Sequence, residues 1–478
     1  MNSRAFATSL GTALAALALA TLLAACGGGG GASPSDAFPG KIDASFGKDG
    51  LFDTRGVVAG VPSSGKSVRV DPAGRLLVAG WMSGAEFNTS LPLFARVLPA
   101  GVLDPAFGSG GYIPATSPVP RQTAEAWAFP VAGGKAVHVH VRYQTCPNDF
   151  SACVYGPGEA VIRHVGPDGT PDPAFPETIL ERTTSRQAIA EPYGAVVLSG
   201  YVAGEDVPWR IGLRRVSADG QPDGAFAQNS DAVLACPALP QDPLSSLQYA
   251  STARLADGRI LVARWDGLDW NRVAAGQVRR TCLTRLLPDG RLDASFGQGG
   301  RVYLEDGGGD AGQVASVAEI LPRSDGGIAL VMNRRSTAAR NSVFGSILWL
   351  SADGTVQVSR GDRGLTKLGP HLGVVAAAVI QADGRIVLAG APPSLDTLFE
   401  TGAPPAVMRL MDTGQADAGF GPHGNGVAPI VLADKFFSIA GLALSTDGAI
   451  HVIGSVIYPT DPAGDWHLGV VKLFGGAR

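Results

Sequence analysis

A unit that recurs seven times along the chain constrains the fold more than any other feature. Each unit reads as an apolar strand, a tight glycine turn, a second strand, a variable connection, a third strand and a second glycine turn. The glycines of the first turn are 58 to 68 residues apart, and such a period is typical of repeat architectures. These glycines are Gly74, Gly134, Gly194, Gly258, Gly326, Gly384 and Gly448.

The second turn carries its own pattern. Its glycine supplies the positive φ angle of a tight hairpin, and an Asp and then a Phe usually follow, each three residues further on. With its short, β-branched strands, each unit holds about four strands, which matches one propeller blade. The Asp/Phe pairs are Asp104/Phe107, Asp172/Phe175, Asp223/Phe226, Asp293/Phe296 and Asp417/Phe420.

The two ends of the repeat array complement one another. The segment 40–47 is a second-turn segment with no first half before it, and 470–476 is a third strand that stops before its turn. We therefore predict an all-β fold over residues 40–478, a seven-bladed β-propeller closed by pairing of the N-terminal strand into the last blade. The alternative is an open solenoid, which usually has atypical capping repeats.

The repeat resembles a known family. Asp257-Gly258-Arg259-Ile260-Leu261-Val262-Ala263, followed by an Arg-Leu-x-Pro-Asp-Gly-x-Leu-Asp-x-Ser-Phe-Gly run over 285–297, is similar to the delta-60 repeat of bacterial exported proteins. The resemblance covers nearly all of the chain after residue 39 and is weakest in the fifth unit. That family is defined by its repeat, so the resemblance implies no catalytic residue.

A basic residue precedes most second-turn glycines by five positions. In the fifth unit this position is Trp349 and the Asp position is Gln357, so Arg and Asp are lost together. Because charges that leave water are normally paired, we predict a partly buried Arg–Asp ion pair within or between blades. The alternative is a ring of arginines that binds an anion. The basic residues are Arg96, Arg215, Arg285 and Arg409, with Arg163 one place early in the second unit.

The N-terminus has the pattern of an export signal. Arg4 precedes an apolar run, 5–25, that ends in small residues; a transmembrane helix is the alternative. Leu23-Ala24-Ala25-Cys26 resembles the lipobox of bacterial lipoproteins, which implies cleavage before a lipidated Cys26. The residue after Cys26 is Gly27, whereas in that family an Asp at this position marks retention in the inner membrane. We expect a signal peptide over 1–25, a Gly/Ser/Pro tether over 26–39, and an outer-membrane lipoprotein of a Gram-negative bacterium, facing the periplasm or the surface.

Charge and cysteine content narrow the partners. The net charge of −4 over 478 residues argues against nucleic acid. Beyond Cys26, an even number of cysteines in an exported protein suits two disulfides, of which three pairings are open. We favour Cys146–Cys153 and Cys236–Cys282, because both pairs would then lie on the face of the long connections. We expect a monomer held at the membrane by its lipid.

Three motifs suggest ligands, and each has a simpler explanation. The run 60–67 matches the P-loop letters, but it continues into a strand where a P-loop needs a helix. His138 and His140 share one strand face, yet no further zinc ligands accompany them by spacing. The acidic loop 305–310 lacks the alternating carboxylates of a calcium loop. We therefore predict no catalytic residue, metal or cofactor.

The topology indicates where a ligand would bind. Both glycine turns of a unit fall at one end of the strands, so the long connections gather at the other end, where repeat proteins concentrate function. Five tryptophans border that face and could hold a protein, peptide or glycan; alternatively, they wedge blades together. We expect a non-catalytic binding or scaffolding module at the cell envelope. The alternatives are a propeller enzyme, a lyase or lactonase-like hydrolase acting at this face or the channel, and a periplasmic assembly partner. The tryptophans are Trp81, Trp209, Trp265, Trp270 and Trp466.

Overall fold

The fold is known from a computed structural model, in which contacts divide the chain at Asp36/Ala37 and place the repeats in the unit Ala37–Arg478. Among the described residues, no helix is long and apolar enough to cross a membrane. The described residues are 37–57, 61–84, 89–113, 121–144, 158–202, 210–226, 234, 249–265, 280–305, 313–336, 343–370, 372–392, 404–461 and 465–476.

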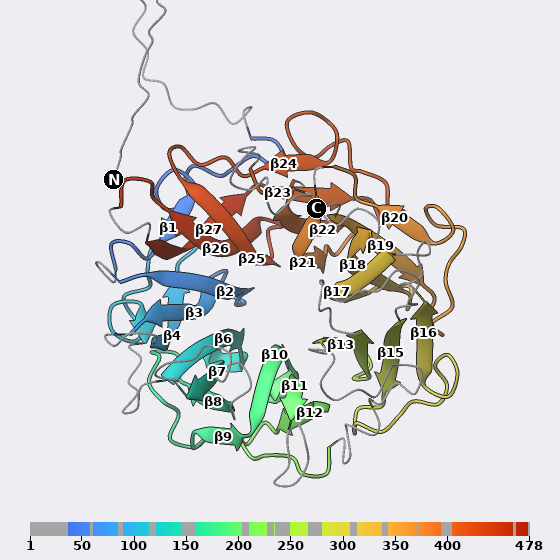
Figure 1. The fold of residues 1–478 in the computed structure, drawn as a ribbon. Helices are drawn as coiled ribbons and strands as arrows, with labels where there is room; N and C mark the ends of the chain where they lie inside the picture. Colours follow the sequence, from blue (N-terminus) through green and yellow to red (C-terminus); the bar gives the residue numbers. More distant parts are fainter. Residues whose placement is uncertain are drawn as a thin grey trace, which may run out of the picture. The chain divides into compact units, whose positions relative to one another are not determined.

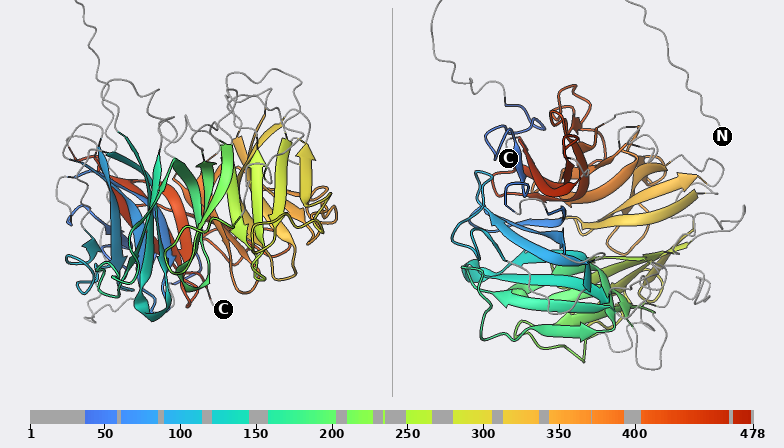
Figure 2. Two further views of the ribbon diagram at one scale, coloured as in Figure 1. Left: turned by 90° about the horizontal axis from the view of Figure 1, so that it is seen from below. Right: turned by 60° about the vertical axis from the view of Figure 1, so that its left-hand side comes forward.

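Seven antiparallel sheets form a ring, and each sheet is one blade (Figure 1). The strands run between the two faces of the ring (Figure 2). The predicted all-β, seven-bladed propeller is therefore confirmed. Blades 1 to 3 contain β2 (Ser63–Val70), β3 (Leu76–Ser83), β4 (Ser90–Val97) and β5 (Tyr112–Ile113); β6 (Arg121–Pro130), β7 (Ala136–Gln144), β8 (Glu159–Val165) and β9 (Thr178–Glu181); and β10 (Thr183–Ala190), β11 (Val196–Val202) and β12 (Arg210–Val216).

The other four blades follow in chain order, and the innermost strand of every blade faces the ring axis. Short 3-10 helices, Ala132–Gly134 and Pro192–Gly194, form the first turns of blades 2 and 3. Blades 4 to 7 contain β13 (Tyr249–Arg254), β14 (Ile260–Trp265), β15 (Arg280–Leu286) and β16 (Arg301–Glu305); β17 (Gln313–Pro322), β18 (Ile328–Ser336), β19 (Val343–Leu350) and β20 (Leu365–Lys367); β21 (Val374–Ile380), β22 (Ile386–Ala391), β23 (Ala406–Leu410) and β24 (Val427–Pro429); and β25 (Phe436–Leu444), β26 (Ile450–Ile457), β27 (Trp466–Leu473) and β1 (Leu51–Asp53).

The hydrophobic core lies between the blades. Among the described residues, seven buried clusters each contain residues of two neighbouring blades, and an eighth, small one joins Cys282 and Tyr303 within blade 4. The cluster between blades 7 and 1, for example, joins Phe46 and Val470 to Val68 and Leu93. Because each sheet face needs a neighbouring sheet to cover it, a single blade has no core of its own.

Both turns of each unit lie at one end of the strands, which we call the turn end; the opposite end is the loop end. The first turn of blade 4 shows why the sequence folds this way. Gly258 adopts a φ of +87°, and its N–H donates to the Leu255 carbonyl at 3.0 Å. The Asp257 carboxylate accepts the Arg259 backbone N–H at 3.1 Å, as Asp does in such turns.

The ring closes by the split blade that the sequence predicted. β1 pairs antiparallel with β27, with Leu51 opposite Val471 and Phe52 opposite Val470. Upstream, Asp43 and Lys472 form an ion pair of 2.9 Å. The N-terminal segment is thus the outer strand of blade 7, which excludes the open solenoid.

The predicted Arg–Asp pair forms within blades 1, 3, 4 and 6. In each of these blades the same arginine also donates a hydrogen bond to a backbone carbonyl of the next blade. In blade 4 the Arg285 Nε donates to Asp293 at 2.7 Å, while Nη1 donates to the Ala352 carbonyl of blade 5 at 2.6 Å. The guanidinium carbon lies 4.6 Å from the centre of the Phe296 ring. We call this arrangement of Arg, Asp, Phe and the next blade's carbonyl the interblade clasp. The other clasps contain Arg96, Asp104, Phe107 and Pro167; Arg215, Asp223, Phe226 and Pro288; and Arg409, Asp417, Phe420 and Gly475.

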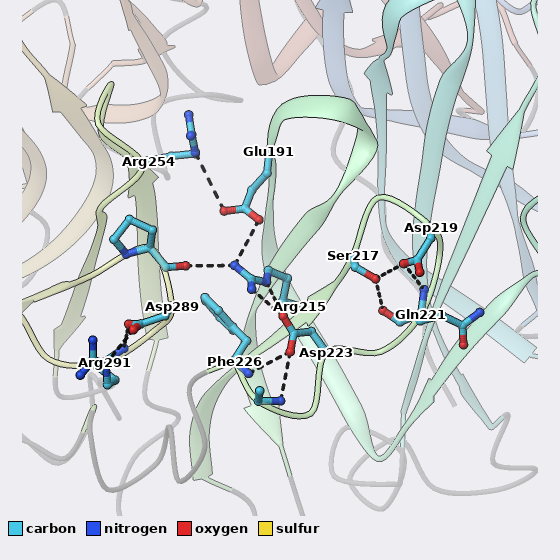
Figure 3. A network of polar contacts seen from close by, with 12 residues as sticks. Glu191, Arg215, Ser217, Asp219, Gln221, Asp223, Phe226, Arg254, Asp289 and Arg291 are labelled. Atoms are coloured by element: carbon cyan, nitrogen blue, oxygen red, sulfur yellow. Dashed lines mark hydrogen bonds and ion pairs between the residues drawn. The ribbon is translucent and has the colours of Figure 1, made fainter.

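Figure 3 shows the clasp of blade 3, in which Arg215 lies between Asp223 and Phe226. Glu191 adds a second carboxylate, with Oε2 at 3.7 Å from Arg215 Nη1 and Oε1 at 4.0 Å from Arg254 Nε. Burial raises the pKa of Glu191, and the two arginines oppose that rise. This clasp therefore continues across to the inner strand of blade 4.

The clasp also explains the second-turn glycines. In blades 1 and 4 the glycine that follows the clasp Phe donates its N–H to the next blade's turn, as Gly297 does to the Asp353 carbonyl at 2.9 Å. A Cβ on Gly354 of that turn would lie 2.9 Å from the Phe296 ring. Glycine is therefore needed there for close approach as well as for its φ of +90°.

Blade 2 departs from the prediction. Arg163 does not reach Asp172; it pairs with Glu177, and Asp172 pairs with Lys135 at 2.7 Å. The clasp position is His164, whose ring stacks on Phe175 with centroids 4.4 Å apart. Side chains alternate between the two faces of a strand, so the one-residue offset of Arg163 places it on the wrong face.

In blade 5 the aromatic and the cationic residue exchange places. Trp349 occupies the Arg position, and Arg360 occupies the Phe position three residues after Gln357. The Arg360 guanidinium lies 5.0 Å from the Trp349 ring and donates to the Asp412 carbonyl of blade 6, the acceptor equivalent to Ala352. Arg323 donates to the same carbonyl at 3.0 Å. The contact to the next blade is therefore kept without the Asp.

The closure makes a first prediction. Deletion of residues 40–52 removes β1 and leaves β27 as an uncovered edge of blade 7. We expect amide exchange in β25–β27 to accelerate about tenfold or more, with new protease cleavage there, because local opening no longer has to break the outer strand pairing. The control is a chain shortened only upstream of Ala37. Equal exchange and equal thermal midpoints in the two chains would contradict closure by this strand.

The clasp makes a second prediction. Burial opposes charge on Asp293, but hydrogen bonds from Ser295, Arg259 and Arg285 outweigh it and hold the pKa well below its usual range. We expect Asp293→Asn to lower the free energy of unfolding at pH 7 by about 3 kcal/mol, because Arg285 stays buried without its partner. The folded-state pKa is depressed, so this contribution is present above about pH 4 and is lost as pH falls below it.

The measurement is urea unfolding of both proteins from pH 7 to pH 3. The gap between their unfolding midpoints should narrow as the pH falls. Asp289→Asn is the matched control, because Asp289 and Arg291 form an exposed pair in the same hairpin, with 51% and 78% of their side chains accessible. A constant gap at all pH values, or an equal effect of the control, would show that the buried pair contributes nothing of its own.

Candidate functional site

The loop end of the ring carries those predicted ligand-face tryptophans that the structure describes. Trp81 lies in β3 opposite Pro92 and is half-buried. Trp265 belongs to the core between blades 4 and 5, which agrees with the alternative that such rings wedge blades together. Trp466 begins β27 and is 39% exposed. Trp209 and Trp270 lie outside the described residues.

Trp466 belongs to an exposed apolar row at the loop end of blade 7. In the sheet register Phe436 lies opposite Ile457, and Ile457 lies opposite Trp466, so the three side chains share one sheet face. Phe436 is 55% exposed and Ile457 is half-buried. We call Phe436, Ile457 and Trp466 the blade 7 platform. Of the three residues only Trp466 is predicted from the sequence, because the other two are brought beside it by cross-strand pairing, which is not a local property.

Charged groups gather around Tyr458, the residue after Ile457, which packs against the core between blades 6 and 7. The Arg55 guanidinium lies 4.1 Å from the Tyr458 ring centre, and the Lys435 ammonium lies 5.5 Å from it. Arg55 pairs with Asp461, and the Tyr458 hydroxyl donates to Asp53. Burial and Asp53 raise the pKa of Tyr458 above its usual value. These charged groups therefore belong to the side of blade 7 that faces blade 6, whereas the platform lies on the other face of the sheet.

The cysteine predictions fall mostly on parts of the chain that the structure does not describe. Cys26, Cys146, Cys153 and Cys236 lie outside the described residues. Cys282 is buried in β15, opposite Arg264 and Tyr303. The lipid on Cys26 and the pairs Cys146–Cys153 and Cys236–Cys282 stay predictions.

Two of the ligand-like motifs are built into strands. Gly65, Lys66 and Ser67 lie within β2, so the P-loop letters do not begin a helix. His138 is buried and stacks on Phe94 with ring centroids 4.1 Å apart. Burial lowers the pKa of His138 to about 3 and that of His140 likewise to about 3, with nearby arginines contributing. Within the described ranges no three His, Cys, Asp or Glu side chains gather as metal ligands would.

Two charged residues on the inner strands were not identified from the sequence. Arg69 lies on β2 and Glu319 on β17, in blades 1 and 5, and both are half-buried. Burial raises the pKa of Glu319 to about 7, although Arg69 opposes the rise. A carboxyl that titrates near neutrality is a candidate acid or base. The available signal was a lone Glu inside an otherwise apolar strand.

Comparisons with known proteins identify the repeat. The family model described as a domain of unknown function (DUF5122), beta-propeller, matches residues 255–296, within blade 4. No curated protein matches the chain. Similar solved structures include the polysaccharide lyase Uly1, at 10% identity and a TM-score of 0.46, covering 86% of this chain and 90% of that one. A protein of unknown function from Dyadobacter fermentans has 10% identity and a TM-score of 0.41, with 87% and 95% covered. The chain therefore contains a β-propeller repeat that matches this family model over residues 255–296.

Proposed function

We propose that the protein is a non-catalytic binding or scaffolding module of the bacterial cell envelope, and that it presents its ligand surface at the loop end of the propeller. The exposed blade 7 platform is the observation that supports this proposal. Two aromatic rings and one aliphatic side chain lie in one row, and partly exposed apolar surface of this kind contributes most of the energy in binding sites.

The position of the chain's first described residues supports the same orientation. The Pro39 carbonyl accepts the N–H of Gly421, and a Cβ on Gly476 would lie 2.8 Å from Pro39. These contacts place the start of the propeller at the turn end. A lipid on Cys26 would therefore be joined to the propeller through a chain that enters it at the turn end.

Loss of the platform rings should reduce ligand binding. On arrays of glycans and of peptides, we expect Phe436→Ala and Trp466→Ala to weaken retained ligands about tenfold or more, because each removes an exposed anchor without altering the core. Val102→Ala is the control, since Val102 is a half-exposed apolar residue in a turn at the opposite end. Unchanged binding by both platform variants would place the ligand elsewhere.

A second candidate is a propeller enzyme, a lyase or lactonase-like hydrolase acting in the channel, and Glu319 is the observation that favours it. This hypothesis predicts product release from a polysaccharide or a lactone with a pH midpoint near 7, where Glu319 changes its charge. Glu319→Gln should abolish that turnover, whereas Glu181→Gln, which changes an exposed carboxyl on β9, should not. Equal turnover by both variants, or none by the natural protein, would exclude Glu319 catalysis of these substrates.

A further inference from the structure

A hollow of about 730 Å³ opens between blades 5 and 6 at the turn end. Its lining includes Arg360, Lys367, Thr366, Thr413 and Gln415, and also Asp362, so two cations, hydroxyls, an amide and one carboxylate line it together. Its volume falls in the range of small-molecule sites. The hollow is far from the blade 7 platform in the ring, and it belongs to the one blade in which the aromatic and the cation of the clasp have exchanged places.

The Arg360 guanidinium lacks the carboxylate that the other clasp arginines have. Arg96, Arg285 and Arg409 each donate Nε to an Asp at 2.7 Å, and no more than 6% of each side chain is exposed. Arg215 donates Nε to Asp223 at 2.9 Å, with 23% of its side chain exposed. The nearest carboxylate to Arg360 among the described residues is Asp325, with its Oδ2 4.0 Å from Nη2. The Arg360 side chain is 23% exposed and lines the hollow. A partly desolvated guanidinium whose carboxylate contact is long favours an anion from outside.

The opposite wall carries a hydroxyl that four other blades lack. Thr366 lies opposite Ile347, two residues before Trp349, and the equivalent positions in blades 7, 1, 4 and 6 are Phe52, Ile113, Val302 and Ala428. Blade 2 has Thr178 at this position, and its hydroxyl donates to the Gly220 carbonyl of blade 3. Thr366 Oγ1 accepts a hydrogen bond from Trp349 Nε1 at 2.9 Å, which orients its own O–H proton away from that ring.

Two glycines leave space around this hydroxyl. A Cβ on Gly414 would lie 2.8 Å from Thr366 Oγ1, and a Cβ on Gly361 would lie 2.9 Å from it. Any other residue at either position would cover the oxygen. Both glycines line the hollow, so the hydroxyl stays accessible between them.

We infer that this hollow is a second binding site, which takes a sugar-sized anion with a carboxylate or phosphate group. Arg360 and Lys367 bind the oxyanion, and the Thr366 hydroxyl with Thr413 and Gln415 donates to or accepts from the sugar hydroxyls. The site is independent of the blade 7 platform, because it lies at the opposite end of the strands and on other blades.

The test is titration of the full chain with glucuronate, glucose 6-phosphate, inorganic phosphate and uncharged glucose, followed by calorimetry. We expect the two charged sugars to bind, glucose not to bind, and phosphate to bind more weakly than glucose 6-phosphate because it has no sugar hydroxyls. The tighter of the two charged sugars identifies carboxylate or phosphate as the natural group. Affinity should fall as salt is raised.

Variants separate the site from its surroundings. Arg360→Gln should weaken binding about tenfold or more, since a hydrogen bond to a charged group is lost. Arg360 also contacts Asp412, so Lys367→Gln on the exposed wall is the second variant, with a smaller loss and unchanged thermal stability. Arg363→Gln is the matched control, because its side chain is 78% exposed and does not line the hollow. No binding by the natural protein, equal binding of glucose, or an equal loss in the Arg363 variant would overturn the inference.

Discussion

The interblade clasp is the interaction on which the rest of the propeller depends. A guanidinium taken out of water is costly unless its donors are satisfied, and here one carboxylate and one ring come from its own blade. The Ser295 hydroxyl of the same blade accepts from Nη2, and Nη1 donates to a backbone carbonyl of the next blade. A blade therefore cannot satisfy its own buried charge alone. The hydrophobic clusters have the same property, because each one is shared by two blades. Polar and apolar contacts thus impose the same condition, namely that each blade needs a neighbouring blade beside it. A closed ring gives every blade such a neighbour on both sides.

The ends of the chain replace the turn that blade 7 lacks. Arg409 of blade 6 donates to the Gly475 carbonyl from the C-terminal end, while Gly421 donates to the Pro39 carbonyl from the N-terminal end. Gly40 then lies against the Phe420 ring, as Gly354 lies against Phe296. The clasp of blade 6 is complete only when both ends of the chain are in place. Closure of the ring and burial of the Arg409 side chain therefore depend on the same contacts.

Much of this fold follows from local sequence. The turn glycines report on contacts within a few residues, whereas the period and the split unit are read from repetition along the chain, so the blade number and the closure could be predicted. The Arg–Asp pair could be predicted as well, because its two members are lost together at Trp349 and Gln357. Its carbonyl partner could not, since any residue supplies a backbone acceptor. Arg163 was misplaced because a single-residue shift on a strand reverses the face.

The candidate sites were harder to predict than the fold, because they depend on register and on contacts across the ring. Trp466 is one residue of the blade 7 platform, and only the pairing of three strands shows that Phe436 and Ile457 lie beside it. Trp265 has the same residue type and a similar place in its unit, yet its strand face is covered by blade 5. Glu319 gains its raised pKa from burial in an inner strand and interacts with Arg69 four blades away along the chain.

A blade that departs from the repeat shows which of its residues maintain the fold. Where the contact to the next blade is kept, the changed residues that make this contact are explained by stability. In blade 5 Trp349 and Arg360 keep both the cation–aromatic contact and the hydrogen bond to blade 6, so stability alone accounts for that exchange. A hydroxyl at the Thr366 position occurs in blade 2 as well, where Thr178 donates to the next blade, whereas four other blades have an apolar residue there. The Arg360 side chain is as exposed as that of Arg215, but its carboxylate contact is longer, 4.0 Å to Asp325. Arg360, Thr366 and Lys367 line one hollow, and this convergence is the observation from which we infer a bound anion.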